Sequence, residues 1–254
     1  MLRIDRIPLF SDNYAYLLTD TETGAVACVD PGTDQPMIDA VDAAGGRLDL
    51  VLLTHHHHDH IGGLIALKDR YGATAVGPEA DRNRMPGLDR GVGHDDMVDF
   101  GAVSIRVIAT PGHTENHVAF FVPDAQALFA GDTLFSLGCG RVFEGTYAQM
   151  WESLLALRAL PDDTQVFCGH EYTEANGRFA ASVDPNNADL LAEIAEDRAL
   201  RAAGEPTIPC SLGVEKRTNP FLRADDPGLA AAIGLAGHPP LTVFTALRQQ
   251  KDRF

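Results

Sequence analysis

A short run of histidines with one aspartate constrains this chain more than any other feature. It follows residues 48–53, whose continuous apolar pattern predicts a buried strand. Side chains two apart on an extended loop point the same way, so the first two candidate ligands can share one metal ion. The other two leave the loop towards a neighbouring position, and one loop therefore predicts the start of two metal sites. The residues at this spacing are His55, His57, Asp59 and His60.

The histidine run also has three simpler interpretations: an affinity tag, a structural zinc site and a low-complexity tract. A tag normally lies at a terminus and has no need of Asp59. A strand, a polar loop and then Ile61-Gly62-Gly63 opening a helix is how α/β enzymes place their chemistry. A metallohydrolase is therefore favoured, with His56 and His58 expected to be exposed or to lie behind the ligands.

Three later segments repeat the arrangement of a short apolar strand, a glycine and a side chain that can bind metal. The strands are predicted at residues 103–109, 127–130 and 165–168, and each is followed by a glycine. A lone histidine after a strand is more often a packed or surface residue, but three such segments behind the first loop favour a shared site. The side chains concerned are His113, Asp132 and His170.

A site with this many imidazole and carboxylate ligands can hold two divalent ions, and such a pair has a defined chemistry. Two cations about 3.5 Å apart lower the pKa of a bridging water towards neutrality and polarise a carbonyl. A hydroxide nucleophile at physiological pH suits acyl hydrolysis. Imidazole and carboxylate discriminate only weakly among zinc, iron and manganese. We therefore expect two divalent ions, zinc first, with iron or manganese as alternatives.

The composition of the 254-residue chain is that of a globular enzyme, and its charge excludes some partners. Hydrophobic residues make up 45% of the chain, which is enough for a large core. A net charge of −16 argues against nucleic-acid binding, which needs a basic surface. No apolar run approaches the roughly 20 residues of a membrane span, and residues 1–12 lack the apolar core of a signal peptide. We therefore expect a cytoplasmic protein that binds neither nucleic acid nor membrane.

The four cysteines are scattered without paired spacing, so neither a disulfide framework nor a zinc knuckle is predicted. We expect all of them to be free buried thiols, and Cys139 to be a packed side chain without a chemical role. They are Cys28, Cys139, Cys168 and Cys210.

The order of apolar and periodic segments predicts an α/β (α+β) protein with two series of strands. The first series is residues 2–7, 13–19, 25–29 and 48–53, and the second is 73–76, 103–109, 117–122, 127–130 and 165–168. Helices are predicted at residues 34–44, 61–71 and 147–159. Two strand series with intervening helices indicate two sheets covered by helices.

From about residue 171 the pattern changes to helices without strands. Helical periodicity occurs at residues 173–183, 188–203 and 241–250. The last of these helices has Arg248 and Lys251 three apart on one face, as an anionic ligand would require. A solvated basic face at the terminus explains the same pair equally well.

The seven candidate ligands together resemble the pattern of the metallo-β-lactamase superfamily, His-x-His-x-Asp-His followed by a distant His, a bridging Asp and a last His. All seven positions are present in order, over roughly residues 10–170. The resemblance implies a four-layer αββα sandwich. It also implies that the first metal is held by His55, His57 and His113 and the second by Asp59, His60 and His170, with Asp132 as the bridge.

Four further segments extend the resemblance to glyoxalase II, the hydroxyacylglutathione hydrolases, over nearly the whole chain. They are residues 138–145, 169–173 and 216–221 and the terminal Arg248 with Lys251-Asp252. The resemblance implies that an αββα domain of residues 1–170 is followed by a helical substrate-binding domain of residues 171–254. It implies that glutathione is held by Arg141, Phe143, Tyr172, Arg248 and Lys251.

Two of these positions depart from the best-studied pattern of the family, which has a lysine at position 141 and a tyrosine at position 143. Arg141 keeps the positive charge and adds bidentate geometry, so binding should survive this change. Phe143 lacks a hydroxyl, and the loss of one hydrogen bond typically costs about 0.5–1.5 kcal/mol. We expect a weaker affinity for glutathione unless another group supplies the contact.

The activity that the resemblance implies is the hydrolysis of S-2-hydroxyacylglutathione thioesters, typically S-D-lactoylglutathione, in the second step of methylglyoxal detoxification. A metal-bridging hydroxide, oriented by Asp59 and Asp132, would attack the thioester, and we expect the enzyme to be a monomer. A lactone hydrolase shares all seven ligands and is the chief alternative. A β-lactamase would have a cysteine in place of Asp132, a persulfide dioxygenase keeps only part of the ligand set, and a flavodiiron-type protein would carry a flavin domain.

Overall fold

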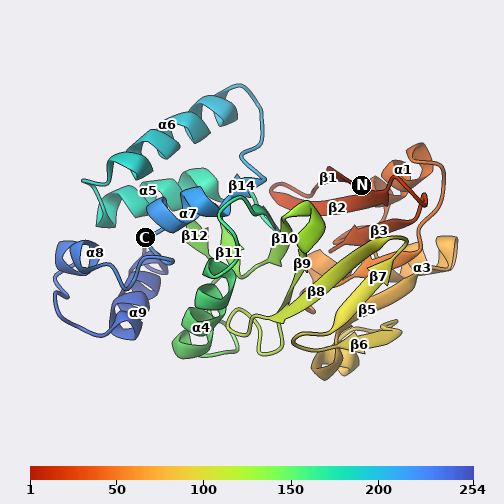
Figure 1. Ribbon diagram of the computed structural model, residues 1–254, viewed down its shortest axis with the longest axis horizontal. Helices are drawn as coiled ribbons and strands as arrows, with labels where there is room; N and C mark the ends of the chain where they lie inside the picture. Colours follow the sequence, from red (N-terminus) through yellow and green to blue (C-terminus); the bar gives the residue numbers. More distant parts are fainter. The chain divides into compact units, whose positions relative to one another are not determined.

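The computed structural model describes residues 1–254, which form two compact units. The first unit consists of residues 1–109 and 116–131, and the second consists of residues 110–115 and 132–254. In Figure 1 the strands of the first unit run from β1, in red, to β10, in green. No helix combines the length and the apolar character that a transmembrane span requires.

The first unit contains a six-stranded sheet with the order β1-β2-β3-β4-β5-β6. The first three strands are antiparallel, and β3 to β6 are parallel. β2, β3 and β4 are buried almost throughout, which explains the continuous apolar sequences of β3 and β4. The strands are β1 (Leu2–Leu9), β2 (Asn13–Asp20), β3 (Val26–Val29), β4 (Leu50–Leu52), β5 (Thr74–Pro78) and β6 (Arg90–Val92).

Four more strands of the first unit form an antiparallel array in which each pairs with the next along the chain. They are β7 (Met97–Phe100), β8 (Val103–Ala109), β9 (Val118–Val122) and β10 (Ala127–Gly131). Tyr16 of β2 meets Phe129 of β10, with ring centroids 5.5 Å apart. Since successive side chains of a strand point to opposite faces, the neighbouring Leu17 faces the other way and joins a separate core.

Helices cover that other face of the six-stranded sheet. The core there combines Met37 and Val41 of α1 with Leu64 and Leu67 of α3 and with strand residues such as Leu17. Apolar side chains on one helical stripe and on one strand face thus produce a helix layer on a sheet, as the sequence predicts. The helical elements of the unit are α1 (Gln35–Ala43), α2 (His58–Ile61), α3 (Leu64–Tyr71), η1 (Glu79–Arg84) and η2 (Pro123–Ala125).

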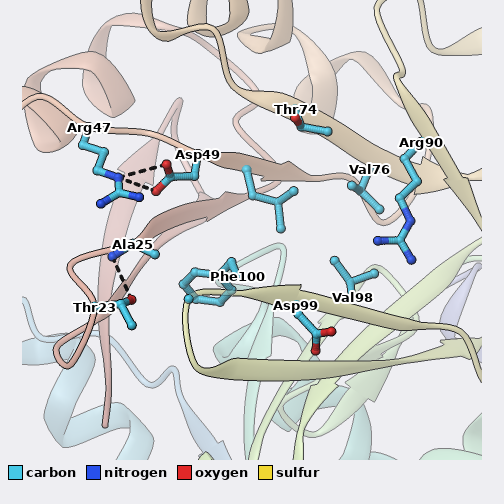
Figure 2. A pocket seen from close by; sticks show the side chains of 12 residues that line it. Thr23, Ala25, Arg47, Asp49, Thr74, Val76, Arg90, Val98, Asp99 and Phe100 are labelled. Atoms are coloured by element: carbon cyan, nitrogen blue, oxygen red, sulfur yellow. Dashed lines mark hydrogen bonds and ion pairs between the residues drawn. The ribbon is translucent and has the colours of Figure 1, made fainter.

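The parallel strands β3, β4 and β5 begin at one edge of the sheet, and the histidine run follows the opposite end of β4. A cavity of about 390 Å³ opens at the edge where the strands begin, with Leu50 and Thr74 in its wall (Figure 2). None of the predicted site residues lines it. Arg47 at its rim is paired with Asp49, and Arg90 donates to the carbonyl of Met97.

The second unit is mainly helical, with two short strand pairs. The antiparallel pairs are β11 (Leu134–Phe135) with β12 (Gly138–Cys139) and β13 (Gln165–Cys168) with β14 (Cys210–Ser211). α5 packs on α6, and α4 packs on α9. The helices are α4 (Tyr147–Arg158), α5 (Thr173–Val183), α6 (Ala188–Ala202), α7 (Leu212–Thr218), α8 (Pro227–Ala232) and α9 (Pro240–Lys251).

Local signals determine where two of these helices begin. Thr146 and Gln149 form a reciprocal capping box at the start of α4. The side chain of Asn187 accepts from the backbone N–H of Leu190 and caps α6. These caps satisfy backbone N–H groups that have no partner inside the helix.

The predicted long strands and helices are present, but the strand at residues 73–76, expected in the second series, forms β5 and pairs with β4 in the first six-stranded sheet. The other differences lie in short or interrupted elements. The helix predicted from residue 61 begins at Leu64, because Gly62-Gly63 separates it from the short α2. A side chain on Gly63 would meet the backbone of Thr33 at 2.7 Å, so a glycine is needed where the two turns touch. The elements not predicted from the sequence are β6, β7, β11, β12, β14, η1, η2, α7 and α8.

Candidate metal centre

Four predicted ligands gather in the first unit, on the loop after β4 and on the short helix α2 that follows it. His55 is fully buried, and its Nε2 atom lies 3.1 Å from Nδ1 of His57. Two nitrogens that bind one tetrahedral ion at about 2.0–2.1 Å lie roughly 3.4 Å apart, so this distance suits a shared ion. His60 Nε2 lies 3.8 Å from Asp59 Oδ2, and the rings of His55 and His60 are 4.2 Å apart. The loop therefore presents two adjacent pairs of ligands.

A carboxylate that the sequence analysis did not single out, Asp30, fixes the orientation of this loop. Its Oδ1 accepts from the backbone N–H of Thr54 at 2.8 Å, and its Oδ2 accepts from the Thr54 hydroxyl at 2.6 Å. Oδ2 also lies 3.0 Å from Nδ1 of His60, and the Thr54 hydroxyl lies 3.0 Å from Nδ1 of His55. With both Nδ1 atoms engaged, the Nε2 atoms of His55 and His60 are the ones available to metal. The ligand atoms of Asp30, His55 and His60 lie within 4.8 Å of one another.

The sequence holds a signal that could have found Asp30. Asp30-Pro31-Gly32 follows β3 directly, and it repeats the arrangement of strand, carboxylate and turn seen elsewhere in the chain. The residue has a positive φ of 50°, which aspartate tolerates better than most side chains.

A second polar group holds the loop through a histidine that is not a predicted ligand. Nδ1 of His56 lies 3.3 Å from Oδ2 of the buried Asp81, and Arg84 donates to Oδ1 of the same carboxylate. Asn116 donates to that Oδ1 at 2.7 Å. His56 is therefore partly buried behind the ligands while His58 is exposed, and both outcomes fall within the expectation for these two residues.

The other three predicted ligands meet in the second unit. Oδ2 of Asp132 lies 3.4 Å from Nε2 of His113 and 3.3 Å from Nε2 of His170. Nδ1 of His113 lies 2.8 Å from the carbonyl of Arg141, and donation to that carbonyl leaves Nε2 for metal. All three side chains are buried. One carboxylate oxygen between two imidazole nitrogens is the arrangement that a bridging carboxylate requires.

The five residues expected to bind glutathione also lie in the second unit, and two of them flank the ligands. The ring of Tyr172 stacks on His170 with centroids 4.6 Å apart and planes at 7°. The ring of Phe143 meets His113 edge-on at 5.2 Å. Phe143 is 59% exposed and Tyr172 is 38% exposed, so both rings present apolar area beside the ligands.

The cationic members of this group converge on Asp252. Its Oδ1 accepts from Nη2 of Arg248 at 3.0 Å and lies 3.4 Å from Nε of Arg141. Arg248 is only 4% exposed and donates from Nη1 to the Cys139 carbonyl, while its Nε has no hydrogen-bond partner. Burial, followed by the charges of Arg248 and other arginines, lowers the pKa of Lys251. Three cations and one carboxylate thus form a locally positive group, with Nε of Arg248 still available as a donor. This group stands out in a chain whose net charge is −16.

All four cysteines are free and buried, as expected. The absence of a chemical role for Cys139 stays a prediction. Burial raises the pKa of Cys139 to about 11 despite the neighbouring Arg248, so its thiol is protonated near neutral pH. The carbonyl of Cys139, rather than its sulfur, receives the short hydrogen bond from Arg248.

Comparison with known proteins places both parts of the chain. Residues 10–170 match the model of the Metallo-beta-lactamase superfamily, and residues 171–254 match that of the Hydroxyacylglutathione hydrolase C-terminus. Hydroxyacylglutathione hydrolase from Ruegeria pomeroyi is 51% identical over 100% of this chain and 99% of its own length. The enzyme of the same name from Methylococcus capsulatus is 50% identical over 100% and 99%.

Solved structures agree with these matches. The crystal structure of ETHE1 from Myxococcus xanthus has a TM-score of 0.66 and 26% identity, covering 98% of this chain and 96% of that one. The crystal structure of TTHA1623 in a di-iron-bound form has a TM-score of 0.59 and 25% identity, covering 87% and 100%.

The fold and the clusters of histidine and aspartate that can bind metal define a hydrolase of the metallo-β-lactamase superfamily, with an α/β fold and a helical C-terminal part. Within that superfamily the identity of about 50% to curated enzymes covers the full chain. The chain belongs to the hydroxyacylglutathione hydrolases, also called glyoxalase II. The predicted fold class and family are thereby confirmed, and the boundary at residue 170 stays a prediction.

Proposed function

We propose that the protein hydrolyses S-2-hydroxyacylglutathione thioesters, typically S-D-lactoylglutathione, to glutathione and a 2-hydroxy acid. This is the second step of methylglyoxal detoxification. The observation that carries the proposal is the group of cationic and aromatic side chains beside two predicted ligands in the second unit. Tyr172 stacks on His170, Phe143 meets His113, and Arg141 and Arg248 converge on Asp252.

The metal site of the proposal comprises two divalent ions, zinc first, with iron or manganese as alternatives. The donors fit such ions. In His55, His60 and His113 the Nδ1 atom contacts a protein oxygen, so the Nε2 atom is available to bind metal. The related structure of TTHA1623 is in a di-iron-bound form. The proposed ligands are His55, His57 and His113 for one ion and Asp59, His60 and His170 for the other, with Asp132 shared.

In the proposed mechanism the protein side chains position both reactants. When bound, two divalent ions lower the pKa of water and polarise the thioester carbonyl. Asp59 and Asp132 orient the attacking water by accepting its hydrogen bonds. The carboxylates of the glutathione peptide pair with Arg141, Arg248 and Lys251, which holds the carbonyl in place for attack.

The leaving group needs little help from the protein. Collapse of the tetrahedral adduct breaks the C–S bond and releases glutathione as a thiolate. Because a thiol has a pKa near 8.5, the thiolate is a tolerable leaving group near neutral pH, and a dedicated general acid is unnecessary. The exposed rings of Tyr172 and Phe143 reduce access of water to the bound thioester.

The remaining partners in the proposal follow from charge and composition. We place the enzyme in the cytoplasm as a monomer that acts on a small anionic thioester and binds neither nucleic acid nor membrane. The net charge of −16 supports the exclusion of nucleic acid. It also makes the local cations necessary for an anionic substrate.

The test is hydrolysis of S-D-lactoylglutathione by the purified protein, followed as the loss of thioester absorbance, with an acyl-homoserine lactone assayed in parallel. Turnover of the thioester that is lost on chelation and restored by zinc, iron or manganese supports the proposal. Full metal occupancy without thioester turnover overturns it. Turnover of the lactone alone would assign the same ligands to a lactone hydrolase.

A further inference from the structure

The tip of the hairpin between β1 and β2 lies against the loop that carries Asp59. Asn13, the first residue of β2, donates from Nδ2 to Oδ2 of Asp59 at 2.9 Å. A Cβ atom on Gly32 would lie 1.9 Å from the carbonyl oxygen of Asp59 and 3.1 Å from Cε2 of Phe10. The ring of Phe10 and the backbone of Asp59 therefore meet at the same glycine.

Phe10 occupies this position at a cost in both conformation and solvation. Its φ is +49°, in the left-handed region that bulky side chains rarely adopt. Its side chain is 61% exposed, so it gains little from the hydrophobic effect. A glycine or an asparagine would form the same turn with less strain. The stability of the hairpin does not account for a phenylalanine here.

Other exposed apolar side chains of the first unit do not combine exposure with a positive φ. Ile65 in α3 and Met97 in β7 are 50% and 45% exposed, but both lie in regular elements with ordinary backbone angles. Single exposed apolar residues of that kind are normal on protein surfaces. Among the exposed large apolar residues Phe10 alone has a positive φ, and strained residues concentrate at functional sites.

We propose that Phe10 forms an apolar wall for the acyl group of the substrate and favours 2-hydroxyacyl groups with an apolar substituent. The inference rests on the proposed function, in which Asp59 is a ligand beside the thioester carbonyl. The substituent on the carbon next to that carbonyl must lie near whatever surrounds Asp59. The only exposed aromatic ring that the structure places against the Asp59 loop in the first unit is that of Phe10. The glutathione half is assigned to residues of the second unit.

The test compares three thioesters of glutathione whose acyl groups differ in apolar area: glycoloyl with a hydrogen, lactoyl with a methyl and mandeloyl with a phenyl. The variant is Phe10→Asn, because asparagine tolerates positive φ and keeps the turn. We expect kcat/KM to fall about tenfold for mandeloyl, about threefold for lactoyl and not at all for glycoloyl, since apolar contact scales with the area covered. A tenfold change corresponds to about 1.4 kcal/mol.

Met97→Gln is the matched control, since it replaces an exposed apolar side chain of the same unit with a polar one. It should leave all three rates unchanged. The thermal midpoint of Phe10→Asn should equal or exceed that of the parent, which separates selectivity from misfolding. If the ratio of kcat/KM for mandeloyl to that for glycoloyl stays within twofold of the parent value, the role of Phe10 is overturned. The proposed function is not affected by that result. A parent protein that hydrolyses none of the thioesters overturns the proposed function and this inference together.

Discussion

Asp30 and Thr54 engage Nδ1 of His60 and of His55, which leaves the Nε2 atoms for the proposed metal ions, and replacement of Asp30 tests this arrangement. In Asp30→Asn one carboxylate oxygen becomes an NH2 group, which would confront a donor on Thr54 or His60. We expect metal affinity, measured by competition with a chromogenic chelator, to fall about 10–100-fold. Asp39→Asn, on the exposed face of α1, should leave the affinity unchanged. An unaltered affinity in Asp30→Asn would show that the loop orients its ligands without this carboxylate.

Replacement of Lys251 separates substrate binding from catalysis. Lys251→Ala removes a cation from the group around Asp252 without touching a metal ligand. We expect KM for the glutathione thioester to rise about tenfold with kcat little changed, as the loss of a charge-assisted contact made equally in ground and transition states would do. Steady-state kinetics beside Lys68→Ala, a surface lysine of the first unit, will show this. An unchanged KM would remove Lys251 from the substrate site.

At the level of single residues, the candidate ligands are easier to predict from the sequence than the groups that hold them in place. His55, His57, Asp59 and His60 share one short motif, so their proximity follows from the chain itself. Asp30 and Asp81 bind the loop from 24 and 25 residues away in the sequence. Such contacts depend on how strands pair and turns pack, and composition or spacing gives no direct sign of them.

At the level of elements, the long apolar strands and the capped helices were predictable because their signals are local. Thr146 with Gln149 and the Asn187 cap are examples. Strands of two or three residues, such as β11, β12 and β14, are too short to show alternation. Their pairing partners, rather than their own sequences, make them strands.

Helix α6 contains a buried carboxyl group with a consequence for stability. Burial raises the pKa of Asp197 to about 7, and one of its oxygens has no hydrogen-bond partner. The folded chain thus keeps a proton that the unfolded chain, with a pKa of about 4, releases. The contribution of this group to stability is fully present below pH 4 and is lost as pH rises towards 7.

Asp197→Asn removes this dependence. We expect the variant to exceed the parent in free energy of unfolding at pH 8 by on the order of 1 kcal/mol, because water screens part of the full effect. The advantage should shrink at pH 5. Urea unfolding at both pH values measures it, with Glu152→Gln on the exposed face of α4 as a control. Equal differences at pH 5 and pH 8 would mean that Asp197 titrates normally in the folded protein.

At the level of the whole molecule, the predicted boundary at residue 170 can be tested by asking whether residues 1–170 fold on their own. A cut there removes α9, on which α4 packs. We therefore expect α4 to lack stable structure in a fragment of residues 1–170. Hydrogen exchange should show rapid exchange of the α4 amides in the fragment and protection in the full chain. Equal protection in both would establish residues 1–170 as an independent folding unit.

The single oxygen of Asp30 that serves both Thr54 and His60 also restricts how this loop can change over evolutionary time. His60 contacts this oxygen directly and His55 contacts it through the Thr54 hydroxyl, so a substitution at either histidine alters the surroundings of the other. Their effects are therefore non-additive, as for any residues in one network. Replacement of either histidine is therefore expected to weaken the position of the other, so the two constrain each other's substitution.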